Sequence, residues 1–142
     1  GDGRSGASIN VQNGSFEKGQ TWADGYYKQP DQAAVPSWNT SAFEGKIELF
    51  RENFGIYIPG VTLKPADEKY AAELNADEES TLYQVLNTQP SSIYEWSLSH
   101  GARTTADTIY FTAFLRICRI LLSFGFNAGH GQTIICVWCL WR

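Results

Sequence analysis

Two glutamates, a histidine and an arginine are the residues of this chain best suited to chemistry on sugars or carboxylates. Glu48 and Glu73 each alternate with apolar neighbours, so we expect them to face the same side of adjacent strands. Two carboxylates about 5–10 Å apart form the catalytic pair of a glycosidase, although spacing in the sequence does not show that distance. His100 and Arg103 follow a predicted strand and are suited to bind a carboxylate or a sugar hydroxyl. The alternative is a structural ion pair with Glu48 or Glu73.

Motifs of the common enzyme classes are absent from the sequence. The chain has no nucleophile elbow, phosphate-binding loop, HExxH zinc motif or EF-hand. A Ser-His-Asp arrangement could be assembled from the residues present, but no local pattern supports one. We therefore predict that the chain is not an enzyme.

The three cysteines all follow position 107. Cys136 and Cys139 have the CxxC spacing of a redox pair or half a zinc site. Zinc needs four ligands, and Cys118 and His130 are the other candidates. The CxxC lies inside an apolar run rather than at the start of a helix, so incidental thiols are the favoured interpretation. A body without cysteine suits an exported bacterial domain stabilised by its core.

Aromatic residues gather in segments without helical periodicity. Sugars bind by stacking their apolar faces on aromatic rings while polar side chains bond to the hydroxyls. We predict Tyr27 and Tyr57 as ligand-binding rings, and Trp38 and Trp96 as core residues because they lie in predicted strands. The other rings in or beside long loops are Trp22, Tyr26 and Phe54.

Alternation and turn residues predict strands at a spacing of about ten residues, with no amphipathic helix. In the segment 46–51 we expect Ile47 and Leu49 to point inward and Glu48 outward, and in 80–87 Leu82 and Val85 compete for the core. This pattern predicts an all-β fold, an antiparallel β-sandwich. The other expected strands are a short one over residues 9–17 that ends at the turn-prone pair 13–14, one that opens at 36–38, and those over 70–75, 93–100 and 133–138, with loops at 18–34 and 53–65.

Charge is distributed unevenly along the chain. Up to position 107 there are fifteen acidic and eight basic residues, a net charge of −7, whereas the remainder has three arginines and no acid. Phosphate binding needs clustered Lys and Arg, so the acidic body argues against nucleic acid as a partner. Neutral sugars are compatible with it.

Residues 109–126 form a largely apolar run. A transmembrane helix of this length is conceivable, but Arg116 and Arg119 lie in its middle, where each costs about 2.5–3.5 kcal/mol. Buried strands with a turn over 125–131 are the favoured prediction, and no membrane span is expected. After position 107 the sequence contains no acidic residue and all three cysteines. This abrupt change suggests a third interpretation, in which residues 109–142 are frameshifted or artefactual.

The chain length fits one domain. Residues 1–8 have no apolar stretch and are interpreted as a flexible leader or a cloning remnant. We predict a single domain over residues 9–142, with 109–142 as its atypical part.

Several motifs in order resemble one family over residues 9–109. Asn13-Gly14-Ser15-Phe16-Glu17-Lys18-Gly19 followed by Trp22 is similar to the first strand of jelly-roll carbohydrate-binding modules. The longer set resembles galactose-binding-like modules in large surface proteins of Gram-positive bacteria. Its further elements are VPSW, GKIELF, AELNA, STLYQ, SSIYEWSLSHGAR and ADTI.

The resemblance implies a jelly-roll, galactose-binding-like sandwich and a set of site residues. In related modules, the glutamate matching Glu17 helps to hold a structural Ca²⁺ away from the sugar site. Calcium takes six to eight oxygen ligands, and the usual second carboxylate of the final strand has no counterpart after Asp107. The alternative is a surface glutamate that pairs with a lysine. The polar residues of the matched motifs are Glu48, Glu73, Asn75, Tyr83, Gln84, His100 and Arg103.

The resemblance further implies a non-catalytic carbohydrate-binding module of a larger exported or cell-surface protein. Its expected partners are a glycan or polysaccharide and neighbouring modules of the same protein, and its expected location is extracellular or attached to the cell wall. The competing class is a structural or adhesive spacer that contacts protein or matrix without binding sugar. Fold analogy does not choose between the two.

Overall fold

The computed structural model describes residues 11–22, 24–52, 64–74, 77–87, 98–102, 109–116, 119–126 and 133–136. These residues form antiparallel strands with almost no helix, which confirms the predicted all-β class. The only helix in this part of the chain is the short 3₁₀ turn η1 (Gln32–Ala34). No described helix has the length and apolar character needed to span a membrane.

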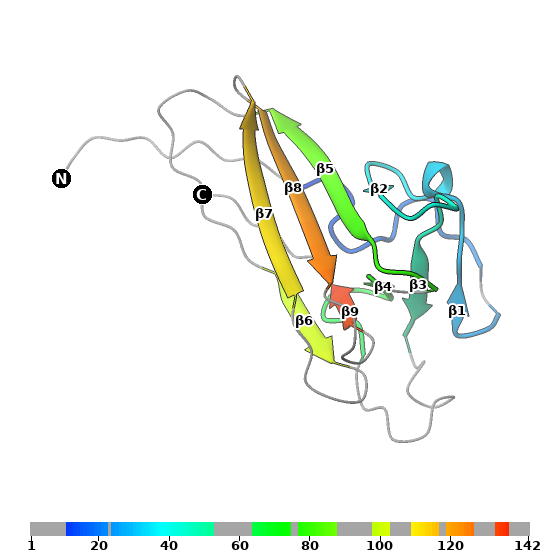
Figure 1. Cartoon of the computed structure of the whole chain (residues 1–142). Coiled ribbons are helices and arrows are strands. Elements are labelled where there is room, and N and C mark those ends of the chain that lie inside the picture. The colour runs from blue at the N-terminus through cyan, green and yellow to red at the C-terminus, as the bar shows by residue number, and fades with distance from the viewer. Residues whose placement is uncertain are drawn as a thin grey trace.

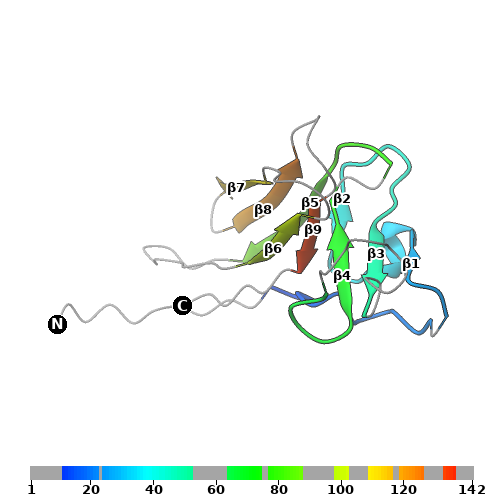
Figure 2. The ribbon, with the colours of Figure 1, turned by 90° about the horizontal axis from the view of Figure 1, so that it is seen from below.

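One sheet has five strands in the order β1-β3-β4-β9-β6, and Figure 2 shows them side by side. Neighbouring strands in this sheet run antiparallel. Strand β9, from the acid-free part of the chain, lies between β4 and β6. The strands are β1 (Tyr27–Lys28), β3 (Glu48–Arg51), β4 (Tyr70–Glu73), β6 (Ser99–Ala102) and β9 (Thr133–Cys136).

The second sheet has four strands in the order β2-β5-β8-β7, also antiparallel. Its three long strands run beside one another in Figure 1. Each residue of β5 has a partner in β8, from Thr81 opposite Gly125 to Asn87 opposite Arg119. The strands are β2 (Asn39–Thr40), β5 (Thr81–Asn87), β7 (Ile109–Arg116) and β8 (Arg119–Phe126).

Buried apolar residues of both sheets belong to one cluster. Leu49 and Ala72 come from the five-stranded sheet, while Leu82 and Leu86 come from the four-stranded sheet. Trp38, predicted as core, is 2% exposed, and its ring stacks on Phe16 with centroids 5.0 Å apart. The core therefore includes side chains that are distant in sequence. Its remaining members are Val11, Val35, Ile47, Tyr70 and Leu74.

The predicted first strand is wrong for residues 11–17, where no strand forms, whereas the turn expected at Asn13-Gly14 is confirmed as part of a turn over residues 12–15. Asn13 and Phe16 have positive φ angles of 53° and 63°, which strand geometry excludes. The Asn13 side chain stabilises the turn, because Oδ1 accepts from Lys18 N (2.9 Å) and Nδ2 donates to Pro36 O (2.9 Å). The asparagine of this motif thus fixes a loop rather than a strand.

Four predicted strands are confirmed with shorter bounds: β3, β4, β5 and β9 lie within the expected ranges. The strand expected to open at 36–38 begins only at Asn39 (β2), since residues 36 and 37 form a turn, and residues 99–100 of the strand expected over 93–100 belong to β6. The expected loop over 18–34 contains β1 and η1. Leu82 is buried and Val85 is 55% exposed, so Leu82 occupies the core. The expected strands at 9–10 and 93–97 and Trp96 lie outside the described residues.

Residues 109–126 form two strands, as predicted, with Arg116 directly opposite Arg119 in the β7–β8 pair. The arginines therefore lie at the connected end of a hairpin. The predicted turn from residue 125 is wrong at its start, since Gly125 and Phe126 belong to β8. Side chain positions in this hairpin are described only for Ile109 and Tyr110.

Candidate functional site

Glu48 and Glu73 are direct partners in the antiparallel pair of β3 and β4, so both side chains lie on the same side of the sheet. This confirms their expected juxtaposition. The prediction that Glu48 points to solvent is wrong, because Glu48 is 7% and Glu73 2% exposed. Gln29 accounts for part of this burial, since its Nε2 donates to Glu48 Oε2 at 2.6 Å. Two carboxyl groups are thus held beneath the surface next to an amide.

Tyr83 and Gln84 are consecutive in β5 and therefore point to opposite faces of the sheet. Gln84 is buried and bonds to the backbone of Gln12, accepting from its N–H (3.1 Å) and donating to its carbonyl (2.6 Å). This pair of bonds ties β5 to the turn around Asn13. Tyr83 is half-buried on the other face. The two predicted ligand residues do not share a site.

Tyr27 and His100 lie on β1 and β6, at opposite edges of the five-stranded sheet. Both are exposed. Tyr27 contacts the rings of Tyr26 (centroids 5.0 Å apart) and Phe50 (6.1 Å). The separation of these edges shows that the predicted ligand residues do not form one cluster. Tyr57, Phe54, Asn75 and Arg103 lie outside the described residues.

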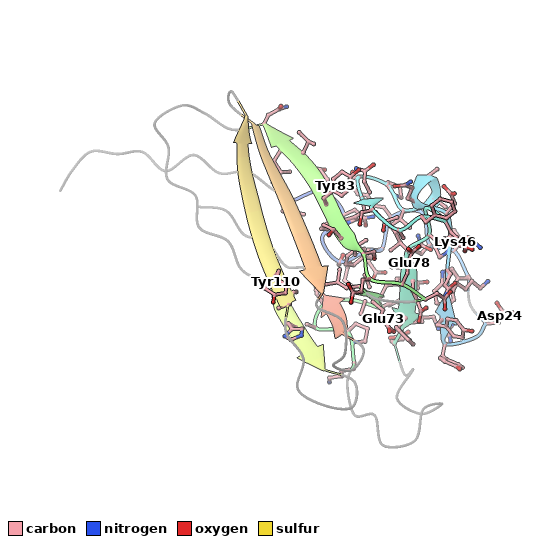
Figure 3. All side chains as sticks on the ribbon, viewed as in Figure 1. Asp24, Lys46, Glu73, Glu78, Tyr83 and Tyr110 are labelled. Carbon is pink, nitrogen blue, oxygen red and sulfur yellow. The ribbon has the colours of Figure 1, made fainter. Side chains whose placement is uncertain are left out.

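A cleft of about 290 Å³ opens between the segments 42–47 and 77–82. Its lining includes Glu73 of β4 and the apolar Ile47 and Leu82, which also belong to the core. Figure 3 shows Lys46, Glu73 and Glu78 on the same side of the molecule. The full lining is Gln29, Ala42, Phe43, Glu44, Lys46, Ile47, Glu73, Asp77, Glu78, Ser80 and Leu82.

Phe43 is the residue of this cleft that sequence reasoning missed. Its side chain is 95% exposed, the most exposed of the large hydrophobic residues described. The only signal in the sequence is an aromatic residue two positions before Gly45, inside a segment that joins two strands. An aromatic ring that is presented to solvent beside polar groups has no role in the core.

Hydrogen bonds fix the loop that presents Phe43. Phe43 N donates to Glu78 Oε1 (2.7 Å), while Ser41 exchanges two bonds with Thr81, at 3.0 and 2.9 Å. Gly45 closes the turn by donating from its N–H to the carbonyl of Ala42 (2.9 Å) at a φ of +68°. The backbone that carries the ring is therefore held by both walls of the cleft.

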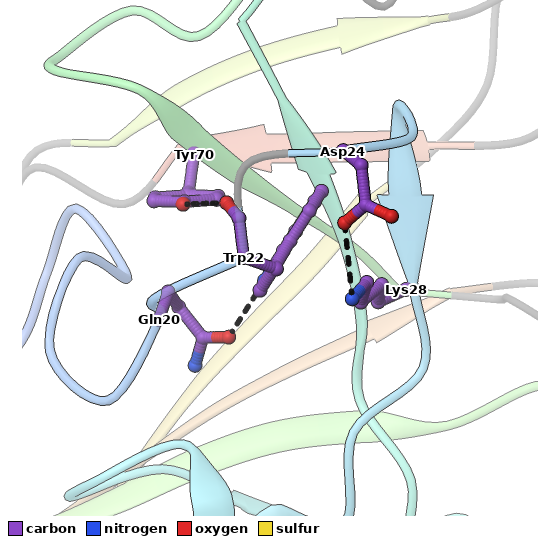
Figure 4. Close-up of polar contacts among 5 residues, drawn as sticks. All are labelled: Gln20, Trp22, Asp24, Lys28 and Tyr70. Carbon is purple, nitrogen blue, oxygen red and sulfur yellow. Dashed lines mark hydrogen bonds and ion pairs between the residues drawn. The ribbon is translucent and has the colours of Figure 1, made fainter.

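Trp22 illustrates a predicted platform that is already occupied (Figure 4). Lys28 Nζ lies 5.4 Å and the Arg51 guanidinium 5.9 Å from its ring centroid, and Tyr70 packs at 5.2 Å. Trp22 Nε1 donates to Gln20 Oε1 at 3.1 Å. Cation–π contacts of this kind cover an indole face. Trp22 therefore offers less surface for stacking than Phe43.

Glu17 joins two distant segments through its carboxylate. Oε1 accepts from Lys69 N (2.7 Å) and Tyr70 N (2.9 Å), so the backbone, rather than a lysine side chain, is its partner in these bonds. Burial raises the pKa of Glu17, a rise that the two backbone N–H donors oppose. Nearby, Glu68 Oε2 accepts from Ser15 Oγ at 2.7 Å.

The calcium site expected at Glu17 needs six to eight oxygen ligands. In the described part of the chain, no group of three or more Asp, Glu, His or Cys side chains is arranged so that it could hold a metal ion. One oxygen of Glu17 is already engaged with two N–H groups. Ca²⁺ at Glu17 therefore stays a prediction. Of the CxxC pair, Cys136 ends β9, whereas Cys139 lies outside the described residues.

Comparison with known proteins provides no further guide to the site: no protein-family model, curated protein or solved structure matches this chain.

Proposed function

We propose that this chain is a non-catalytic carbohydrate-binding module of a larger exported or cell-surface protein. The observation that carries the proposal is the 95% exposed ring of Phe43 at a cleft of about 290 Å³. Exposed rings beside hydrogen-bonding groups are how proteins seat the apolar face of a sugar. The cleft volume is near the lower end of the roughly 300–1,000 Å³ typical of ligand pockets, which favours a short glycan segment.

Polar groups around Phe43 match the needs of sugar hydroxyls. The carboxylates of Glu44 and Asp77 accept hydrogen bonds, and the ammonium of Lys46 donates them. Loop bonds hold Phe43 before any ligand arrives, which lowers the entropic cost of binding. A glycan enters this cleft with its ring against Phe43 and its hydroxyls toward the polar wall.

The proposed architecture is a jelly-roll sandwich of galactose-binding-like type. Its support is the core cluster that draws Leu49 and Ala72 from one sheet and Leu82 and Leu86 from the other. Sheets that share a core in this way pack face to face in a sandwich. The motif resemblance over residues 9–109 supports the same proposal.

A spacer module that contacts protein or matrix is the second candidate. It is favoured by the outer face of the four-stranded sheet, where Val85 is 55% and Tyr110 50% exposed. Tyr110 is opposite Gly125, which is opposite Thr81, so Tyr110 shares a face with Thr81, Tyr83 and Val85. Apolar side chains on such a face suit contact with a neighbouring module.

Retention on insoluble polysaccharides and a glycan array tests the choice. Phe43→Ala is expected to abolish glycan retention, because it removes the stacking ring without touching the core. Val85→Ala is the control, since it removes an exposed apolar side chain of β5 outside the cleft lining and leaves retention unchanged. Tyr27→Ala and Tyr57→Ala report whether these predicted rings extend the site. Absence of retention on every polysaccharide overturns the proposal and favours the spacer.

A further inference from the structure

We propose that the cleft beside Phe43 ranks glycans by charge. A sugar with a free protonated amine binds more tightly than its N-acetylated counterpart, and both bind more tightly than an acidic sugar. The inference rests on the proposed function, because it names the ligand class of the same cleft.

The cleft combines an apolar seat with an unbalanced charge. The exposed ring of Phe43 provides contact surface whose attraction does not depend on the charge of the ligand, while Ile47 and Leu82 lie buried beneath the cleft. Around this seat, the exposed carboxylates of Glu44, Asp77 and Glu78 outnumber the ammonium of Lys46 three to one. A neutral sugar can therefore bind, while a charged one gains or loses affinity according to its sign.

The carboxylates are available to a ligand. In the part of the chain that the structure describes, the side chains of Glu44 and Asp77 take part in no hydrogen bond or ion pair. Glu78 accepts from Phe43 N through Oε1, which fixes its carboxylate next to the ring. An ammonium group on a sugar stacked against Phe43 can donate to these oxygens, since charge-assisted bonds are stronger than neutral ones. A uronic acid in the same place meets like charge.

Lys46 does not reverse this ranking. It supplies a single cation to the lining, and its backbone is fixed by a bridge to Asp31 at the end of the turn. Its flexible ammonium can donate to a hydroxyl of a neutral or amino sugar. One ammonium among three exposed carboxylates leaves the surroundings of the ligand negative.

Calorimetric titration with three β-1,4-linked trisaccharides of the same ring configuration tests the ranking: those of glucosamine, N-acetylglucosamine and glucuronic acid. At about pH 6 a sugar amine is protonated, as an α-amino group is. We expect the glucosamine trisaccharide to bind roughly 3- to 10-fold more tightly than the acetylated one, the range of a few exposed ion pairs. The difference should shrink at about 0.5 M salt, because screening weakens exposed pairs.

A double variant, Glu44→Gln with Asp77→Asn, should remove the preference for the amine while retaining binding of the acetylated trisaccharide. The control, Asp24→Asn with Glu52→Gln, removes the same net charge from exposed residues outside the cleft lining. It should keep the preference, which distinguishes a local effect from the overall acidity of the chain.

Two failures are distinguishable. If no trisaccharide or polysaccharide binds in a manner that depends on Phe43, the proposed function fails. If the acetylated trisaccharide binds through Phe43 but the amine gives no advantage, or the acidic trisaccharide binds as tightly, the ranking by charge is overturned and the proposed function stands.

Discussion

The carboxylate of Glu17 carries a pH dependence that follows from its surroundings. Burial raises its pKa above the ordinary value, and the nearby Glu68 adds to the rise; the N–H groups of Lys69 and Tyr70 and the charge of Lys69 oppose it. A raised pKa means that the folded protein holds this proton more tightly than the unfolded chain does. Ionisation of Glu17 therefore costs stability although its oxygen is well bonded.

The sign of the effect on stability follows from linkage. Between the unfolded and folded pKa values of Glu17, the folded state binds more protons, so the free energy of unfolding falls as the pH rises. Glu17→Gln keeps an oxygen that accepts hydrogen bonds and cannot ionise. We expect the variant to gain stability relative to the parent chain as the pH rises from about 4 to about 7: its free energy of unfolding minus that of the parent should increase. Urea denaturation at several pH values measures the difference; a constant or opposite trend contradicts the assignment.

The parent chain and the Glu17→Gln variant also test whether Glu17 binds Ca²⁺. If Glu17 ligates Ca²⁺, calcium raises the melting temperature of the parent chain, EDTA reverses this, and Glu17→Gln weakens the response. A parent melting temperature that is indifferent to EDTA removes Glu17 from consideration as a ligand. The pH experiment is done in EDTA so that the two effects stay separate.

Single residues show where sequence reasoning succeeds and where it stops. Trp38 is predictable as core because an aromatic residue beside a strand is rarely left in water. The inward position of Glu48 is not predictable from the sequence, since it depends on the contact with Gln29 and on the register with Glu73. Phe43 was missed for a related reason: the exposure of a loop residue depends on what the rest of the chain leaves uncovered.

Elements were predictable where alternation and turns agree. β3 and β5 follow from alternation over 46–51 and 80–87, and β4 lies within the strand expected over 70–75. The turn was predictable at Asn13-Gly14, but the position of Phe16 was not predictable, because Phe16 has a positive φ and is buried by tertiary contacts and not by strand alternation. Strand partners were unpredictable as well, since pairing such as β4 with β9 joins residues that are distant in sequence.

The turn that presents Phe43 depends on Gly45. Its φ of +68° is strained for any residue with a Cβ, and a Cβ there would lie 3.2 Å from Gln32 Nε2. The amide oxygen of Gln32 accepts from Thr40 N at 3.0 Å, so displacing this side chain disturbs β2. We expect Gly45→Ala to lower the free energy of unfolding by about 1–2 kcal/mol, the cost of a left-handed non-glycine residue, and to weaken glycan binding.

Gly25 provides the matched control. Its φ is +74°, but a Cβ there would meet nothing closer than 4.0 Å, and it lies outside the cleft lining. Gly25→Ala should therefore cost similar backbone strain and leave glycan retention unchanged. Urea denaturation and affinity-gel retention of both variants separate the two effects. Equal loss of retention in both would show that Gly45 acts through overall stability and not through the position of Phe43.

At the scale of the whole molecule, the acid-free segment is built into both sheets. β7 and β8 extend the four-stranded sheet beside β5, and β9 separates β4 from β6 in the five-stranded sheet. The composition break at position 108 therefore does not coincide with a break in the sheets. Whether residues 109–142 are frameshifted is a separate question, which intact mass and the encoding DNA read in all three frames answer.

Truncation after residue 108 measures how far the rest of the chain depends on this segment. Without β8, the whole of β5 loses a partner, and without β9, β4 and β6 have no connection through the sheet. We expect the 1–108 chain to lose the cooperative urea transition and the near-ultraviolet circular dichroism of the full chain, because exposed strand edges and an uncovered core favour unfolding and aggregation. A cooperative transition of undiminished midpoint in the 1–108 chain would show instead that the first 108 residues form a domain by themselves. That result would support the interpretation of residues 109–142 as artefactual.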